Sequence, residues 1–83
     1  MRYKCPCCGY YTLDHIANGS YDICPVCFWE DDIVQNEDPS FEGGANEPCL
    51  IQTRKNFQNF SASEFRLVQH VRKPLPEELS RFG

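Results

Sequence analysis

The 83-residue sequence has no long hydrophobic run, and no stretch approaches the roughly 20 consecutive apolar residues of a membrane span. The first residues, MRYKCPCCG, also lack the apolar segment of a secretory signal peptide. We therefore expect a cytoplasmic protein that does not interact with a membrane. In that reducing compartment, clustered cysteines indicate metal binding or catalysis rather than disulfides.

Histidine is scarce, which narrows the classes of enzyme to consider. The sequence has two histidines, and it shows no Ser-His-Asp arrangement, no phosphate-binding loop and no His-rich catalytic metal site. We expect His15 at the surface or beside a metal site formed by other residues. We expect His70 on the solvated face of a helix.

Basic residues are outnumbered by acidic ones, and the net charge is −4. Because nucleic-acid binding depends on neutralising phosphates, no nucleic-acid partner is expected. The charge is also uneven: residues 1–49 carry two basic and nine acidic side chains, whereas residues 50–83 carry six basic and three acidic ones. We expect the basic half to pack on the acidic half or to be solvated; the alternative is that it recruits an acidic partner.

A chain this short forms one domain with a marginal apolar core, and domains of this size commonly need a disulfide or metal staple. The six cysteines are the obvious material for such a staple. The chain is predicted to be a single domain, 1–83, with four parts: a zinc-ribbon part (1–34), an acidic loop (35–48), two helices (49–73) and a tail (74–83).

Two Cys-x-x-Cys pairs predict the metal site. Fifteen residues separate the pairs, a spacing typical of zinc ribbons, in which two tight turns called knuckles each supply two ligands. Four thiolates complete the tetrahedron of a structural zinc site. Glycine follows the first pair and phenylalanine the second, so the two knuckles are expected to differ. The predicted ligands are Cys5, Cys8, Cys24 and Cys27.

Zinc is the expected metal, and iron is the alternative. A tetrahedral site of four sulfurs suits either ion, and Cys-Pro-x-Cys-Gly-Tyr is similar to the knuckle of rubredoxin-like iron proteins. Three disulfides are disfavoured by the spacing and by the missing export signal. A thioredoxin-like redox motif is disfavoured because it has one such pair, at a helix N-terminus in a larger fold.

The predicted fold is a small α+β domain, in which a zinc-ribbon β-hairpin carries two C-terminal helices packed on it. Residues 10–13 and 20–23 are β-prone, and Asn18-Gly19 between them suits a tight hairpin turn. A first helix is expected over 49–59, with Leu50, Ile51, Phe57 and Phe60 on its apolar side. The sequence Ser61-Ala-Ser-Glu64 fits a capping box that starts a second helix, which Pro74 ends.

Several further residues can be interpreted as having either a structural or a functional role. Cys7 is expected to be an exposed bystander, and Cys49 a small buried residue near a helix start; the alternative is ligand exchange or a redox pair. Trp29 is expected to fill the core, with a binding aromatic as the alternative. The acidic residues 30–32 are expected to form a solvated turn, with a hard-metal site or a catalytic cluster as the alternative.

Three motifs of the sequence resemble those of a known family. Cys-Pro-Cys-Cys-Gly-Tyr at 5–10, Ile-Cys-Pro-Val-Cys-Phe-Trp-Glu-Asp-Asp at 23–32 and Gly-Gly-Ala-Asn at 43–46 are similar to the bacterial cysteine-rich CPCC proteins. The resemblance covers residues 3–73. It implies a small, bacterial, cytoplasmic, zinc-binding protein whose biochemical role is not established. Cys7 belongs to the family motif, whereas Cys49 does not.

The function expected from these observations is a non-enzymatic protein-interaction module that is stabilised by zinc. Its partner is an unidentified protein, and its oligomeric state is not predicted. The alternatives are a rubredoxin-like electron-transfer protein that holds iron, and a thiol-redox or metal-dependent enzyme that uses Cys7. Four cysteine ligands leave no open position for catalysis at the metal itself. The candidate interaction surfaces are residues 30–32, Gly43-Gly44 and the basic side chains of 66–73.

Overall fold

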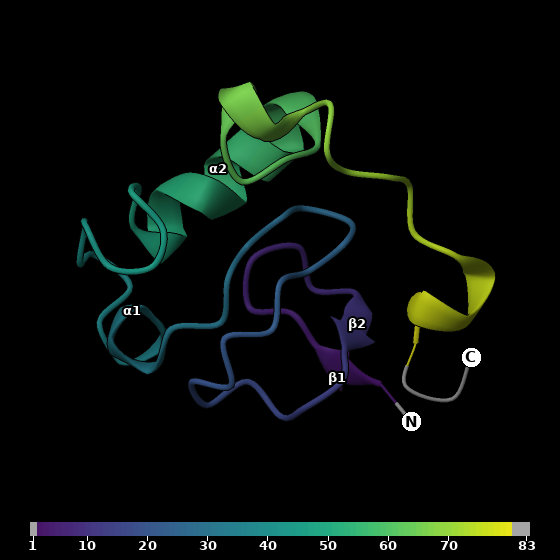
Figure 1. Ribbon diagram of the computed structural model, residues 1–83. Helices are drawn as coiled ribbons and strands as arrows, with labels where there is room; N and C mark the ends of the chain where they lie inside the picture. The colour runs from purple at the N-terminus through teal and green to yellow at the C-terminus, as the bar shows by residue number, and fades with distance from the viewer. Residues whose placement is uncertain (1, 81–83) are drawn as a thin grey trace.

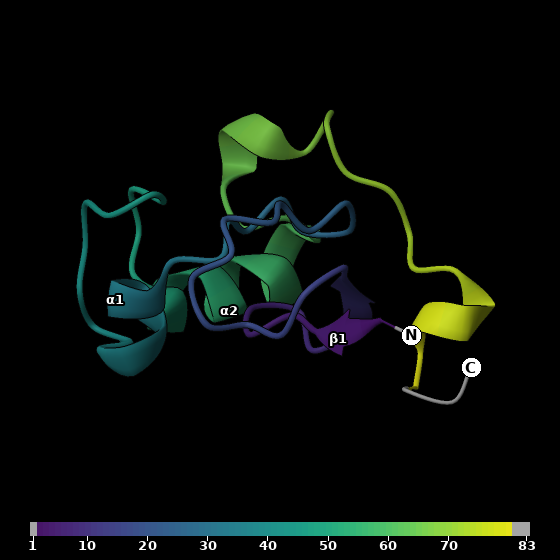
Figure 2. The same cartoon turned by 60° about the horizontal axis from the view of Figure 1, so that its bottom comes forward.

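The computed structural model describes residues 2–80 and shows a small α+β fold with few regular elements (Figure 1). A two-stranded antiparallel sheet is followed by two α-helices, and the second helix lies along one side of the N-terminal half (Figures 1 and 2). The predicted fold class is therefore confirmed. The elements are β1 (Tyr3–Lys4), β2 (Tyr11–Leu13), α1 (Ile33–Glu37), α2 (Leu50–Phe60) and the 3-10 helices η1 (Phe65–Leu67) and η2 (Pro76–Glu78).

The hairpin does not pair the segments that the sequence suggested. β2 falls within the predicted strand 10–13, but its partner is β1, with Tyr3 opposite Leu13, and the two strands enclose the first Cys-x-x-Cys turn. The predicted second strand, 20–23, forms only a single bridge, from Ile23 to Glu30, which encloses the second turn. The prediction was wrong because each Cys-x-x-Cys turn brings its own flanking residues together. The segment between the two turns then serves as a connection.

That connection is held by a buried carboxylate instead of a strand ladder. Oδ2 of Asp31, which is 0 % exposed, accepts the N–H groups of Gly19 and Ser20 at 2.9 and 2.8 Å. Oδ1 of the same carboxylate accepts Nδ2 of Asn36 at 2.6 Å. The expectation that residues 30–32 form a solvated turn is therefore wrong, because two of the three acids satisfy backbone groups that would otherwise be buried without partners.

Helix α1 begins in the same acidic group and was not predicted. Oδ1 of its N-cap residue Asp32 accepts the N–H groups of Val34 and Gln35, and Oδ2 accepts the N–H of Ala45 at 2.8 Å. The Ala45 N–H is the main reason that the pKa of Asp32 lies below its usual value. One carboxylate thus starts the helix and anchors the loop that follows it.

The segment predicted as a loop or linker, 35–48, is fixed by two buried amide side chains. Nε2 of Gln35 donates to the carbonyls of Phe41, Asn46 and Pro48, and its Oε1 accepts from the backbone and the side chain of Asn46. The Asn46 amide in turn pairs with both backbone groups of Glu30. The loop is therefore a packed part of the fold, although it contains little regular structure beyond α1.

Helix α2 lies within one residue of the predicted helix. Its N-cap is Cys49, whose Sγ accepts the N–H of Gln52 at 3.4 Å. Leu50, Thr53 and Phe57, spaced three and four residues apart, form the face that packs on the N-terminal half, whereas Ile51 is 45 % exposed.

The second C-terminal helix is absent from the described residues, which contain only the 3-10 turn η1 between α2 and Pro74. Ser61 does not cap a new helix; it ends α2 in a left-handed conformation (φ 62°), with its N–H bonded to the carbonyl of Phe57. The chain then turns back, because the N–H of Ser63 donates to the carbonyl of Cys27 at 2.7 Å and Asn56 holds the Ser63 carbonyl. These contacts of Ser63 hold the chain against the second knuckle, and the predicted second helix therefore does not form.

The core lies between α2 and the two Cys-x-x-Cys turns. Trp29 is completely buried there, as predicted, beside Leu13, Val26 and Leu50. Four of the cysteines belong to the same buried cluster, so the interior is both apolar and rich in sulfur. Within residues 2–80, the helices are too short and too polar to cross a bilayer.

We predict that Gly44→Ala destabilises the fold by about 2 kcal/mol through overpacking. A Cβ on Gly44 would lie 2.7 Å from Oδ2 of Asp32 and 2.8 Å from Cδ of Gln35. Both neighbours are buried and held by hydrogen bonds, so neither can move aside freely. The measurement is urea-induced unfolding of the metal-loaded protein at a fixed concentration of free metal.

Glu42→Ala is the matched control in the same loop. Its side chain is exposed, so its unfolding free energy should stay within about 0.5 kcal/mol of the parent. Equal stability of the two variants would show that the loop does not pack as tightly around Gly44 as described here.

Candidate metal centre

The first Cys-x-x-Cys turn is closed by two backbone hydrogen bonds. The N–H of Gly9 donates to the carbonyl of Cys5 (2.9 Å), and the N–H of Cys5 donates to the carbonyl of Tyr10 (2.8 Å). Gly9 adopts a left-handed conformation, with φ of 81°, which glycine reaches without steric cost. The turn thereby points the side chains of Cys5 and Cys8 toward the same space.

The second turn repeats this backbone pattern. The N–H of Phe28 donates to the carbonyl of Cys24 (2.7 Å), and the N–H of Cys24 donates to the carbonyl of Trp29 (2.9 Å). Phe28 has φ of 70°, a conformation that costs a residue other than glycine about 1–2 kcal/mol. The expectation that the two knuckles differ is therefore wrong for the backbone, because both knuckles have the same hydrogen-bond pattern and a left-handed residue after the second cysteine. The second knuckle reaches this conformation at the cost of backbone strain at Phe28.

The four predicted ligands come together. The Sγ atoms of Cys5 and Cys27 are 3.6 Å apart and those of Cys8 and Cys24 are 3.7 Å apart. All four Sγ atoms lie within 4.8 Å of one another. Among residues 2–80 this is the one group of three or more Cys, His, Asp or Glu side chains with such geometry, so the acidic residues 30–32 form no comparable site.

These separations fit a tetrahedral metal ion. Four sulfurs at about 2.3 Å from a central ion lie about 3.8 Å from one another. The Cys5–Cys27 and Cys8–Cys24 separations are close to that value. Three of the cysteines are completely buried and Cys8 is partly exposed, as suits a closed structural site near the surface. The four cysteines can therefore bind one metal ion together.

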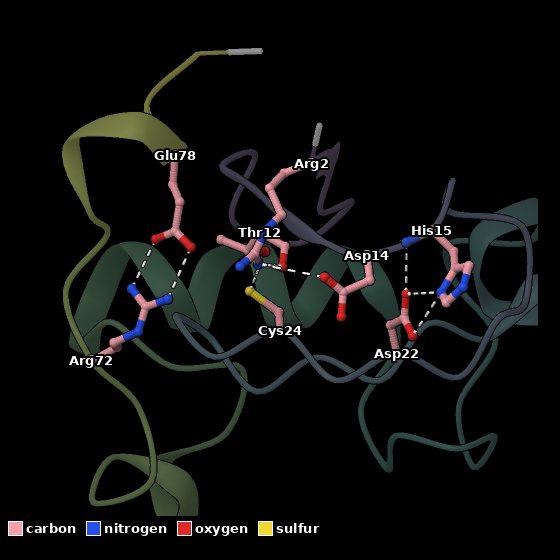
Figure 3. Close-up of polar contacts among 8 residues, drawn as sticks. All are labelled: Arg2, Thr12, Asp14, His15, Asp22, Cys24, Arg72 and Glu78. Carbon is pink, nitrogen blue, oxygen red and sulfur yellow. Dashed lines mark hydrogen bonds and ion pairs between the residues drawn. The ribbon is translucent and has the colours of Figure 1, made fainter. Parts of the chain in front are cut away.

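Cys24 receives two further hydrogen bonds. The hydroxyl of Thr12 lies 2.9 Å from its Sγ (Figure 3). The N–H of Val26 donates to the same sulfur at 3.4 Å. Thr12 lies on β2 and is 2 % exposed, so its hydroxyl has little access to water as an alternative partner. Thr12 was not identified from the sequence, because a threonine in a β-prone segment gives no signal of its own.

Contacts among the four sulfurs favour ionisation at Cys24. The pKa of Cys24 is lowered because the thiols of Cys27, Cys5 and Cys8 hydrogen-bond to it, with a contribution from Thr12. The pKa values of Cys5 and Cys27 are raised, chiefly by the same contact with Cys24. Four thiolates this close together need a cation between them, and a divalent metal ion supplies that charge.

Cys7 is buried rather than exposed, so the expectation of an exposed bystander is wrong. Its side chain is 7 % exposed and lies in the core cluster. A hydrogen bond with Cys27 is the main reason that the pKa of Cys7 is lowered, and the Thr53 hydroxyl on α2 contributes. Cys7 thus lies beside a predicted ligand without belonging to the group of four.

The remaining cysteine and the two histidines lie outside the site. Cys49 is half-buried and caps α2, in place of the buried apolar role expected for it. His15 is exposed and its Nδ1 lies 2.9 Å from Asp22 (Figure 3). The ring of His70 is exposed and packs against Phe28, with the centroids 5.6 Å apart. None of the three belongs to the four-sulfur group.

The family described as Cysteine-rich CPCC matches residues 3–78, which is nearly the whole chain. The chain belongs to the cysteine-rich CPCC family. A search of curated proteins found no match.

The CPCC motif itself comprises residues 5–8, which carry two of the four clustered cysteines and the buried Cys7. The motif at 23–32 carries the other two clustered cysteines, Cys24 and Cys27, and its last four residues, like the motif at 43–46, form the scaffold around the cluster. Residues 29–32 supply the buried Trp29 and the carboxylates that hold the connection and start α1, and residues 43–46 form the loop that Gln35 and Asp32 anchor. The motifs of this CPCC protein therefore define one sulfur cluster and the scaffold around it.

We predict that Thr12→Val weakens metal affinity about tenfold. The change removes a hydroxyl that can donate to the Cys24 thiolate, and groups that hydrogen-bond to metal ligands typically contribute 10- to 100-fold to affinity. The measurement is a competitive titration of the purified protein with zinc and a chelator of known affinity.

Thr12→Ser is the control, because it removes the methyl group of the same side chain and keeps the hydroxyl that lies beside Cys24. Its zinc affinity should remain within about threefold of the parent, as expected if the hydroxyl is the group that supports the ligand. If both variants bind zinc as tightly as the parent, the Thr12–Cys24 contact does not support the site.

Proposed function

We propose that this CPCC protein is a small zinc-stabilised protein-interaction module without catalytic activity, in which Cys5, Cys8, Cys24 and Cys27 bind the metal. The observation that carries the proposal is the convergence of four Sγ atoms within 4.8 Å from two knuckles of the same geometry. The role of the metal is structural. It would link the two knuckles, which share no strand pairing with each other.

The free energy of zinc binding is large enough to support a structural role for the metal. A structural zinc contributes about 10–16 kcal/mol of apparent binding free energy, whereas the net stability of a whole domain is about 5–15 kcal/mol. The described residues contain two short strands and one helix longer than two turns, which leaves little regular structure to hold the chain without the ion. Iron is the alternative metal, because its thiolate chemistry accepts the same four ligands.

The arrangement of the other reactive groups supports a role without catalysis. Four protein ligands fill a tetrahedral ion and leave no position for substrate. Cys7, the thiol on which an enzyme would depend, is buried between the second knuckle and α2. The carboxylates of Asp31 and Asp32 are occupied by backbone and side-chain donors, so they are not available as general bases.

A cytoplasmic location and a protein partner belong to the same proposal. All six cysteines are free thiols in the structure, which a reducing compartment preserves. The net charge of −4 disfavours nucleic acid as the partner. The candidate surface at residues 30–32 is withdrawn, since two of its three acids are buried, whereas Gly43 and Gly44 and the basic residues of 66–73 are largely exposed.

We predict that Cys24→Ser removes the metal and that Cys49→Ser does not. Cys24 is completely buried in the sulfur cluster, whereas Cys49 caps α2 away from it, and serine is a good N-cap residue. Elemental analysis of the freshly purified proteins should give about one zinc per chain for the parent and for Cys49→Ser, as a single tetrahedral site requires.

For Cys24→Ser the zinc content should fall well below the parent value. Equal zinc in both variants would exclude Cys24 as a ligand and contradict the proposed site. A stoichiometric content of iron, visible as the reddish colour of ferric thiolate, would assign the protein to electron transfer instead.

A further inference from the structure

A cavity of about 320 Å³ lies beside the metal centre, where the two knuckles face the C-terminal half of the chain. Tyr10 comes from the first knuckle and Val26 from the second, while Phe57 and Ser61 come from α2. The last wall of the cavity comes from a segment that we call the C-terminal strap and define as residues 71–78. The strap follows η1 and runs to η2 beside the hairpin (Figure 1). A cavity of this volume accommodates one or two side chains of a partner.

The strap is held in place by a specific set of contacts. The N–H of Arg72 donates to the carbonyl of Pro25 at 3.2 Å, which ties the strap to the second knuckle. The Arg72 guanidinium forms two hydrogen bonds with Glu78, at 2.8 and 2.9 Å (Figure 3). Glu78 also accepts the N–H of Leu75. Glu78 is 1 % exposed, so this paired contact fixes the curve of the strap and keeps the cavity wall in place.

The lining combines apolar walls with positive charge. The residues that line it are Tyr10, Val26, Phe57, Ser61, Val71, Arg72, Lys73 and Pro74, and none of them is acidic. The rings of Tyr10 and Phe57 meet edge to face, with centroids 6.2 Å apart. Glu78 neutralises Arg72, whereas Lys73 is exposed and has no ion-pair partner among residues 2–80. The cavity therefore suits an apolar group with an anion next to it.

The basic half of the chain is not neutralised by the acidic half. The four ion pairs among the described residues are Arg2–Asp14, His15–Asp22, Arg66–Glu64 and Arg72–Glu78, and none joins residues 1–49 to residues 50–80. The basic half was expected to pack on the acidic half or to be solvated, and both occur: Nε of Arg54 donates to the carbonyl of Pro6, and Arg66, Arg72 and Lys73 are exposed. Lys73 remains available to an external anion.

We infer that the cavity binds a short acidic peptide segment of a partner protein. A leucine or phenylalanine side chain of the peptide inserts against Tyr10, Val26 and Phe57, and the carboxylate of an adjacent aspartate or glutamate pairs with Lys73. The apolar walls supply affinity, and the positive rim selects acidic over basic sequences. This inference rests on the proposed function and deepens it, because it names the surface and the chemistry of the partner.

Peptide binding should also depend on the metal. Tyr10 directly follows Gly9 at the end of the first knuckle, and Val26 lies between two residues of the second. Both walls are therefore positioned by the turns that the metal joins, and the cavity is complete only when both knuckles are closed. The metal would thus control recognition without taking part in chemistry.

The test is a titration of ¹⁵N-labelled, zinc-loaded protein with the peptide acetyl-Gly-Phe-Glu-Gly-amide, followed by amide chemical shifts. The expected result is saturable shifts at Tyr10, Phe57 and residues 71–73. Two control peptides, with Lys in place of Glu or Ala in place of Phe, should bind at least about fivefold more weakly. That factor corresponds to the free-energy contribution of one exposed ion pair or one partly buried side chain.

A charge-reversal pair supplies the matched protein control. Lys73→Glu should weaken the binding of the acidic peptide at least about fivefold, because it places like charges together at the cavity rim. Lys55→Glu makes the same change in net charge at an exposed position of α2 that does not line the cavity, and screening at physiological salt should keep its effect below about twofold.

Two results would overturn the inference. Equal affinity for the acidic and basic peptides, or no shift at about 5 mM peptide, a concentration above the Kd of even weak ligands, would exclude an acidic segment as the occupant. If the zinc-loaded spectrum is well dispersed in that experiment, the proposed metal-stabilised fold stands and only the cavity assignment fails. A collapsed spectrum in the presence of bound zinc would contradict both.

Discussion

The structure depends on the convergence of four cysteine sulfurs in a space too small for four negative charges. Hydrogen bonds within the group favour a thiolate at Cys24 and disfavour ionisation at Cys5 and Cys27. A divalent ion at the centre would remove this conflict and join two turns that share no strand pairing with each other. The other parts of the fold either shape those turns or pack against them.

Outside the metal centre, buried polar side chains perform the task that extended sheets and long helices perform in larger domains. Asp31, Asp32, Gln35 and Asn46 together satisfy the backbone of the connection, the start of α1 and the loop before α2. Each of these side chains is 9 % exposed or less. Such networks are costly unless every member is paired, so they restrict the chain to one arrangement.

The convergence of the four cysteines, the fold class and α2 could be predicted because each has a local signal: the spacing of the cysteines, the composition, and the helical spacing of Leu50 and Phe57. The pairing of β1 with β2 and the end of the helix at Ser61 could not, since both follow from contacts between distant residues, such as Ser63 with Cys27. The burial of Asp31 and the role of Thr12 also depend on tertiary packing, because the local sequence around each fits a solvated turn or an ordinary strand.

The central claim is that the ion, and not the apolar core alone, holds the chain in this fold. The most direct test compares thermal unfolding of the purified protein, followed by near-UV circular dichroism of its buried tryptophan, with and without a strong zinc chelator. Our account predicts a cooperative transition for the metal-loaded protein and loss of that transition, with loss of the Trp29 signal, once the metal is removed. A metal-free chain that still unfolds cooperatively in the chelator would contradict it.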